Sequence, residues 1–100
     1  MAAKYYRLAA EQGDMDAQNK LGVRYKRGQG VPQDYSEAAK WFQKAADQGH
    51  ALAQFNLAEL YRCGKGVPEN NAMAIKYYTL AAKQGDMDAQ KALWDTRLYF

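Results

Sequence analysis

Apolar residues recur at helical spacing along the chain, and glycine-rich segments interrupt them at regular intervals. Ala17, Leu21 and Tyr25 fall at i, i+4 and i+8, which places them on one stripe of a helix. No segment alternates apolar and polar residues with a period of two, so we expect no strands. The pattern predicts helices near residues 2–12, 15–27, 35–48, 51–63 and 71–84, and a sixth that starts at about Met87.

The chain also contains an internal repeat of 36 residues. Residues 14–49 align with residues 50–85 without a gap, and Met1 to Leu21 matches Met73 to Leu93 at twice that distance. A fixed period of this length indicates stacked helix pairs that bury one another's apolar faces. We therefore expect one all-α solenoid domain. Two full repeats are predicted at 14–49 and 50–85. An incomplete repeat at 1–13 supplies only a second helix, and another at 86–100 supplies a first helix followed by a C-terminal cap.

Capping residues and glycines predict where the helices of a repeat begin and end. Asp14 suits the N-cap of the first helix, and Gly28 suits a left-handed C-terminal cap. Asp34, with Glu37 three residues later, predicts a capping box at the start of the second helix. Gly22 lies beside the apolar stripe, so we expect the second helix to approach the first closely there.

Three motifs recur with this spacing in the first full repeat. They are A-Q-x-x-L-G-x-x-Y at 17–25, G-x-G-V-P at 28–32 and A-x-x-W-F-x-K-A-A-x-Q-G at 38–49. Together they resemble the Sel-1-like repeat, a relative of the tetratricopeptide repeat with a longer elbow between its helices. The resemblance implies a right-handed α-solenoid that acts as an adaptor, with first helices lining a concave face and no common catalytic residue. Some relatives pair cysteines within each repeat, a subtype that the single Cys63 does not fit.

First-helix residues that are not needed for packing form the candidate partner-binding surface. An apolar anchor of Leu52 and Phe55 beside cations suits an extended peptide with an aromatic or aliphatic residue and a nearby carboxylate. The alternative, in which Phe55 packs between neighbouring first helices, has equal weight. The full predicted set on the concave face is Asn19, Val23, Lys26, Arg27, Leu52, Phe55, Glu59, Arg62 and Lys91. The expected partner is a protein or a peptide.

Charge and composition argue against several other classes of partner. Fourteen basic and eleven acidic residues give a net charge of +3 that is spread along the chain, whereas a nucleic-acid binder concentrates basic residues in a stripe. Weak nucleic-acid binding through Lys20, Arg24, Lys26 and Arg27 remains a distant alternative. No apolar run is long enough to span a membrane, and no signal-peptide pattern is present. The compartment stays open, and a single cysteine is compatible with the cytoplasm.

Catalytic and metal-binding constellations are scarce in this sequence. Ser36 is the only serine and falls in the first turn of a predicted helix, where hydroxyls help capping. His50 occupies the helix-start position that Asp14 holds in the previous repeat. His50 and Cys63 supply too few ligands for zinc, and the G-x-G elbows lack the Lys-Ser/Thr of a phosphate loop. We expect no enzymatic activity, no cofactor and no metal.

The two ends depart from the repeat pattern. The chain begins with a second helix, and Trp94 replaces the Gly or Ala expected at the position of close approach. We expect the open C-terminal end to be covered by Trp94, Leu98, Tyr99 and Phe100. The array is either part of a longer one or completed by another copy, so self-association through the repeat ends is the alternative function.

Overall fold

A computed structural model describes the backbone of residues 2–97 and the side chains of residues 4–95. This described backbone forms helices and connecting turns, without strands. The helices are α1 (Ala2–Glu11), α2 (Met15–Arg27), α3 (Tyr35–Asp47), α4 (Ala51–Cys63), α5 (Asn71–Lys83) and α6 (Met87–Arg97). The all-α prediction is confirmed, and each predicted boundary lies within one residue of the observed one.

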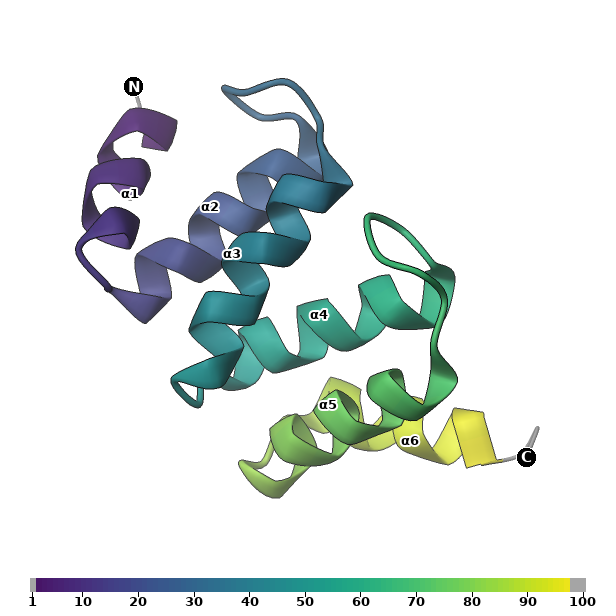
Figure 1. Ribbon diagram of the computed structural model, residues 1–100. Coiled ribbons are helices and arrows are strands. Elements are labelled where there is room, and N and C mark those ends of the chain that lie inside the picture. Colours follow the sequence, from purple (N-terminus) through teal and green to yellow (C-terminus); the bar gives the residue numbers. More distant parts are fainter. Residues whose placement is uncertain (1, 98–100) are drawn as a thin grey trace.

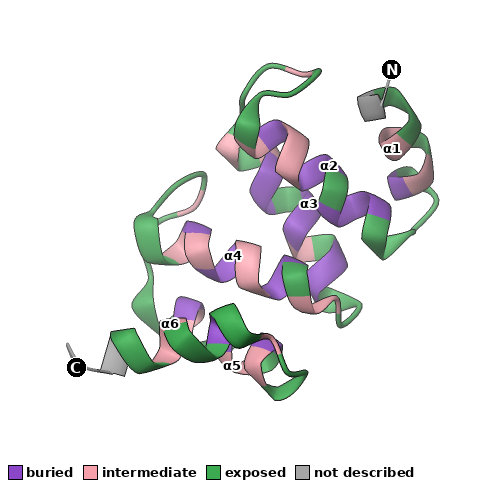
Figure 2. Cartoon of the chain, turned by 180° about the vertical axis from the view of Figure 1, so that it is seen from behind, coloured by how far each residue is buried: buried purple, intermediate pink, exposed green. Residues whose placement is uncertain are grey.

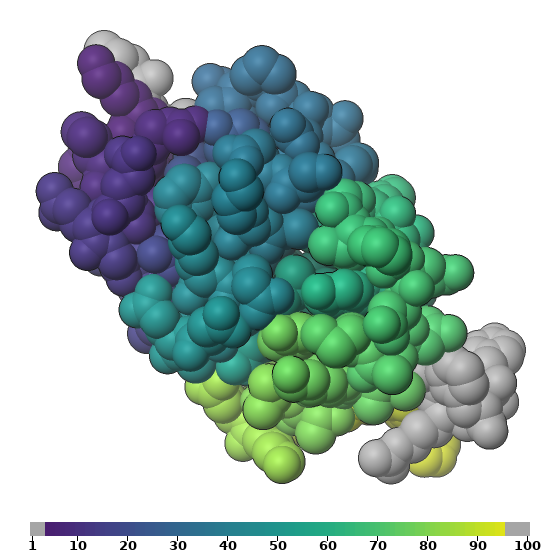
Figure 3. Space-filling model, viewed as in Figure 1, coloured from purple at the N-terminus to yellow at the C-terminus, as the bar shows by residue number. Residues whose placement is uncertain are grey.

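Successive helices stack into an elongated array (Figure 1). α2 packs most extensively on α3, and α4 on α5, so each of these pairs forms one repeat. The pairs then stack through α1 on α2, α3 on α4, and α5 on α6. The molecule measures 42 × 24 × 17 Å, and Figure 3 shows its long shape. Units that contact mainly their chain neighbours define a solenoid.

The predicted caps at both ends of α2 are present. The Asp14 carboxylate accepts a hydrogen bond from the backbone N–H of Ala17 at 2.9 Å. At the other end, Gly28 has φ 68°, a left-handed conformation in which its N–H donates to the carbonyl of Arg24. This conformation favours glycine and turns the chain into the elbow.

The capping box predicted at the start of α3 is only half formed. The Asp34 carboxylate accepts from the N–H of Glu37 at 3.1 Å, as predicted. The reciprocal bond is replaced, because the elbow folds back and the Asp34 N–H donates to the carbonyl of Tyr25 at 2.9 Å. The Glu37 carboxylate instead pairs with Lys40 at 3.0 Å.

The core follows the contact between the two helices of each repeat. Figure 2 shows buried residues along the facing sides of α2 and α3. Leu21, Phe42, Leu57 and Tyr78 have essentially no exposed surface. A Cβ atom at Gly22 would lie 2.6 Å from two ring carbons of Phe42, so this position requires glycine for the observed packing.

The C-terminal end is described only in part. Trp94, the first residue of the predicted cap, is 65% exposed. Leu98, Tyr99 and Phe100 lie outside the described residues, so the cap stays a prediction.

Replacing Gly22 by valine tests the close approach of α2 and α3. The branched side chain must displace the Phe42 ring, so we expect the free energy of unfolding to fall by about 1–3 kcal/mol. Urea denaturation followed by circular dichroism measures this loss. Ala72→Val, at an exposed position of α5, is the control for placing valine in a helix. An equal, small effect of both substitutions would contradict the packing account.

Candidate partner-binding surface

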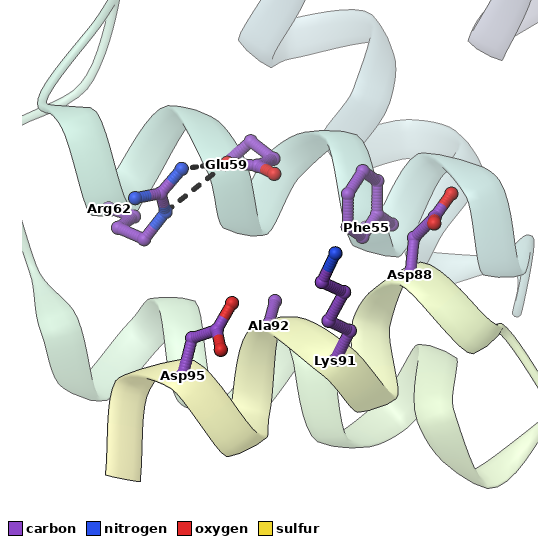
Figure 4. Close-up of a pocket in the computed structure, with 7 residues that line it drawn as sticks. All are labelled: Phe55, Glu59, Arg62, Asp88, Lys91, Ala92 and Asp95. Atoms are coloured by element: carbon purple, nitrogen blue, oxygen red, sulfur yellow. Dashed lines mark hydrogen bonds and ion pairs between the residues drawn. The ribbon is translucent and has the colours of Figure 1, made fainter. Parts of the chain in front are cut away.

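Among the described residues, three of the hollows lie along the side of the molecule formed by the first helices α2, α4 and α6, which we call the first-helix face. The N-terminal hollow, of about 250 Å³, is lined by Tyr6, Lys20, Val23, Arg24, Arg27 and Gln29. The central hollow, of about 230 Å³, is lined by Lys26, Tyr35, Phe55, Glu59, Leu60, Cys63 and Lys65. The C-terminal hollow, of about 250 Å³, is lined by Phe55, Glu59, Arg62, Asp88, Lys91, Ala92 and Asp95 (Figure 4).

The hollows are successive copies of one groove. Val23, Glu59 and Asp95 occupy the same position in consecutive repeats, and they line the N-terminal, central and C-terminal hollows, respectively. Lys26 and Arg62 are likewise one repeat apart, in the central and C-terminal hollows. The backbone therefore repeats the same shape while the side chains change its chemistry.

Phe55 is the shared wall of two neighbouring hollows. Its side chain is partly buried, and its ring centroid lies 5.7 Å from that of Tyr78. It also lines both the central and the C-terminal hollow. The ring therefore packs on α5, which is a second helix, and its role in partner binding stays a prediction. Core packing fixes the ring and leaves part of it accessible.

Arg62 connects this surface to the core. Its guanidinium donates to the Glu59 carboxylate at 2.6 Å and to the Tyr78 hydroxyl at 3.0 Å. Burial, with the nearby Glu59 carboxylate, raises the pKa of Tyr78 to about 12, while the Arg62 guanidinium acts in the opposite direction. The bonds to Glu59 and Tyr78 raise the pKa of Arg62 itself. Arg62 is therefore already partnered, whereas Lys91 forms no ion pair with any described side chain.

Figure 4 shows how these groups face one another. Lys91 and Asp95 extend from α6 towards α4, whereas Arg62 turns along α4 towards Glu59. Acidic and basic side chains therefore both surround the apolar ring of Phe55. Such a groove can hold an extended segment through one apolar contact and several ion pairs.

Two residues of the predicted set lie elsewhere. Asn19 is only 7% exposed, and its side-chain oxygen accepts a hydrogen bond from Asn56 at 3.0 Å, so it joins α2 to α4. Leu52 is 55% exposed but does not line the hollow that Phe55 shares with α6. Of the two residues of the predicted anchor, Phe55 lines the central and C-terminal hollows, and Leu52 lines neither of them.

Sequence reasoning missed Tyr35 and Lys65, which line the central hollow. The elbow of the second repeat lies against the start of α3, since a Cβ atom at Gly66 would collide with the carbonyl oxygen of Tyr35. This contact brings the Lys65 ammonium to 5.3 Å from the centre of the Tyr35 ring. The glycine-rich elbow was the only feature of the sequence that pointed to this region. Helical periodicity does not predict where a loop packs.

The predicted capping role of His50 is confirmed. Its Nδ1 accepts from the N–H of Ala53 at 3.1 Å, and its Nε2 lies 2.7 Å from the carboxylate of Asp16. His50 thus joins the starts of α2 and α4. Within the described side chains, no three His, Cys, Asp or Glu residues come together as a metal site. None of the described helices has the length and apolar character needed to cross a membrane.

Family comparison agrees with the repeat boundaries seen in the structure. The Sel1 repeat family model matches residues 1–14, 16–50 and 51–86. The chain belongs to the Sel1 repeat family. No curated protein matches it in a sequence search.

Solved structures of Sel1 repeat proteins resemble the whole array. A Sel1 repeat protein from Oxalobacter formigenes is 38% identical with a TM-score of 0.89, over 92% of this chain and 69% of that one. Cysteine-rich protein B of Helicobacter pylori is 28% identical with a TM-score of 0.85, over 91% and 68%. A protective antigen of uropathogenic Escherichia coli, with an SLR fold, is 44% identical with a TM-score of 0.90 over 92% of this chain. The chain spans only 20% of that antigen.

The raised pKa of Tyr78 predicts a loss of stability at alkaline pH. An unfolded tyrosine titrates near pH 10, so between about pH 10 and about pH 12 the unfolded chain loses a proton that the folded chain keeps. The free energy of unfolding should be unaffected below that window and fall by about 2–3 kcal/mol across it. Urea denaturation at several pH values measures this, with Tyr78→Phe as the control. Parallel profiles of the two proteins would contradict the assignment.

Proposed function

We propose that this Sel1 repeat chain is a non-catalytic scaffold that binds a protein or peptide partner on its first-helix face, the concave side of the solenoid. Sel1 repeat proteins are in general protein-interaction scaffolds. The observation that carries the proposal is the series of hollows in register with the repeats, with the partly exposed ring of Phe55 between two of them. A partly exposed aromatic ring in a groove is a typical anchor for a partner.

The surroundings of Phe55 favour a polypeptide ligand. The central hollow combines the aromatic ring of Tyr35 with the ammonium of Lys65, and the C-terminal hollow places Lys91 near two aspartates. A small molecule requires a more enclosed site with convergent polar groups. A chain of residues can instead use several shallow hollows in sequence, each with one side chain.

The chemistry of the described residues supports a non-catalytic role. Both ring nitrogens of His50 are engaged, one by the helix cap and one by Asp16, so the imidazole is not available as a general base. Ser36 lies exposed in the first turn of α3. Neither residue belongs to the first-helix face, where a substrate would be expected to bind.

Self-association through the repeat ends is a second candidate, favoured by Tyr5. Tyr5 is 71% exposed, whereas the residues at the same position of the next two repeats, Trp41 and Tyr77, are 6% and 5% exposed. An uncovered aromatic at a position buried elsewhere can bind another copy. Sedimentation velocity over a range of concentrations tests this. A mass that rises with concentration, and that Tyr5→Ser returns to the monomer value, would support self-association; a constant monomer mass would contradict it.

Removing the anchor and its free cation tests the scaffold proposal. Phe55→Ala combined with Lys91→Ala should weaken partner binding by about tenfold or more, because both groups face the C-terminal hollow. Lys91 is preferred to Arg62 for this test, since removing Arg62 would also leave the buried Tyr78 hydroxyl without its donor. Proteins retained from a native lysate by each variant are identified by mass spectrometry, and their affinities are then measured.

The matched control is Leu80→Ala with Lys83→Ala, which removes an apolar and a basic side chain from α5. Both double variants should keep the circular dichroism of the parent protein. Equal retention of the same partner by the two variants would move the binding site away from the first-helix face. A loss of helicity confined to the Phe55 variant would identify Phe55 as a core residue.

A further inference from the structure

The charge of the three hollows changes steadily along the array. The N-terminal hollow has three basic residues and no acidic one. The central hollow has two basic residues and one acidic residue, and the C-terminal hollow has two basic and three acidic residues. The same groove therefore changes from basic at α2 to mixed at α4 and more acidic at α6.

The basic residues of the N-terminal hollow form no ion pair with the described carboxylates. Lys20 and Arg24 lie over the ring of Tyr6, at 5.5 and 5.6 Å from its centre. Neither residue, nor Arg27, forms an ion pair with a described side chain. This end of the face is therefore ready to pair with carboxylates of a ligand.

The C-terminal hollow has the opposite preference. Arg62 pairs with Glu59, so these two charges largely satisfy each other. Asp88 and Asp95 are exposed and form no ion pair with described side chains, and a single lysine, Lys91, lies between them in sequence. Two free carboxylates against one free ammonium favour a basic residue of the ligand.

The central hollow is the apolar section of the face. Tyr35, Phe55 and Leu60 line it, and its two ammonium groups, Lys26 and Lys65, accompany only one carboxylate. Lys65 is already placed over the Tyr35 ring. An aliphatic or aromatic side chain of a ligand fits this hollow best, because apolar walls cannot satisfy a buried charge.

We propose that the first-helix face binds one extended peptide segment whose side chains run acidic, apolar and basic in the direction from α2 to α6. This inference rests on the proposed scaffold function and adds the chemistry of the partner. The hollows lie along consecutive first helices, which pack chiefly on the second helices between them rather than on one another. The three side chains are therefore separated by several residues of an extended chain, which advances about 3.3–3.6 Å per residue.

Five synthetic peptides with blocked ends and a central leucine test this order of charges. Each is about nine residues long, which spans the three hollows. The mixed peptide has acidic residues on one side of the leucine and basic residues on the other, and the remaining three are all-acidic, all-basic and neutral. An extended peptide can bind in either chain direction, so the mixed peptide is made in both orders. Fluorescence anisotropy at low salt measures the affinities.

The parent protein should bind the better of the two mixed peptides about threefold or more tightly than the other three probes. Reversing the acidic end with Asp88→Lys and Asp95→Lys should transfer this preference to the all-acidic peptide. The control, Glu11→Lys with Glu69→Lys, makes the same change in net charge at exposed positions outside the three hollows, and it should keep the preference for the mixed peptide.

Each other result overturns the proposed order of charges. Equal binding of all probes, or no binding of any, would contradict the proposed acidic, apolar and basic order of the bound peptide. Tightest binding of the all-acidic peptide by the parent protein would indicate a uniformly anionic ligand, such as a nucleic acid. The same shift of preference in the control variant would show that net charge alone decides binding. None of these results depends on the partner-retention experiment, which tests the scaffold function separately.

Discussion

The contact between a large aromatic ring of the second helix and a small residue of the first helix is the constraint on which the rest of this structure depends. In the first repeat the ring of Phe42 occupies the space that a Cβ of Gly22 would need. In the second repeat Ala58 and Tyr78, at the same two positions, are both fully buried. Because these rings fix how closely the two helices approach, they also fix how the first helix and its exposed residues sit relative to the second.

The candidate binding surface is an extension of this packing. The buried Tyr78 ring packs beside Phe55, and the Tyr78 hydroxyl accepts a hydrogen bond from Arg62. Two of the side chains that line the C-terminal hollow, Phe55 and Arg62, are therefore held by a buried residue that does not line it. A preorganised surface loses little conformational entropy when a partner binds, which suits a scaffold. The repeats keep an apolar stripe, as Leu21 and Leu57 illustrate, and vary other positions, as Phe55 and Lys91 illustrate.

Every helix boundary that was predicted from the sequence lies within one residue of the observed one, because local chemistry determines those ends; the end of the sixth helix was not predicted. Asp14 and Gly28 cap α2 through bonds within a few residues of themselves, so the pattern alone identifies them. Predictions weakened where a contact joins distant segments. The capping box at Asp34 is incomplete because its N–H bonds to Tyr25, and Asn19 is buried because it meets Asn56 of the next repeat.

The lining of the hollows could be predicted only where it depends on helical spacing and not on contacts between distant segments. Helical spacing placed Phe55, Glu59, Arg62 and Lys91 on one face, and all four line the C-terminal hollow. Spacing could not separate Leu52 from Phe55, since both point away from the stripe of Leu57. It also could not place Lys65, whose position depends on how the elbow packs against the start of α3. Loop packing depends on tertiary contacts that have no period in the sequence.

Nuclear magnetic resonance of the isotope-labelled chain, titrated with a partner retained from a lysate, tests the central claim most directly. The account predicts that backbone amide shifts change along α2, α4 and α6, in the elbow around Lys65 and at the start of α3 beside Tyr35, while the rest of α3 and the outer side of α5 stay unchanged. Shift changes confined to the second helices, or to α1 and the end of α6, would contradict binding on the first-helix face.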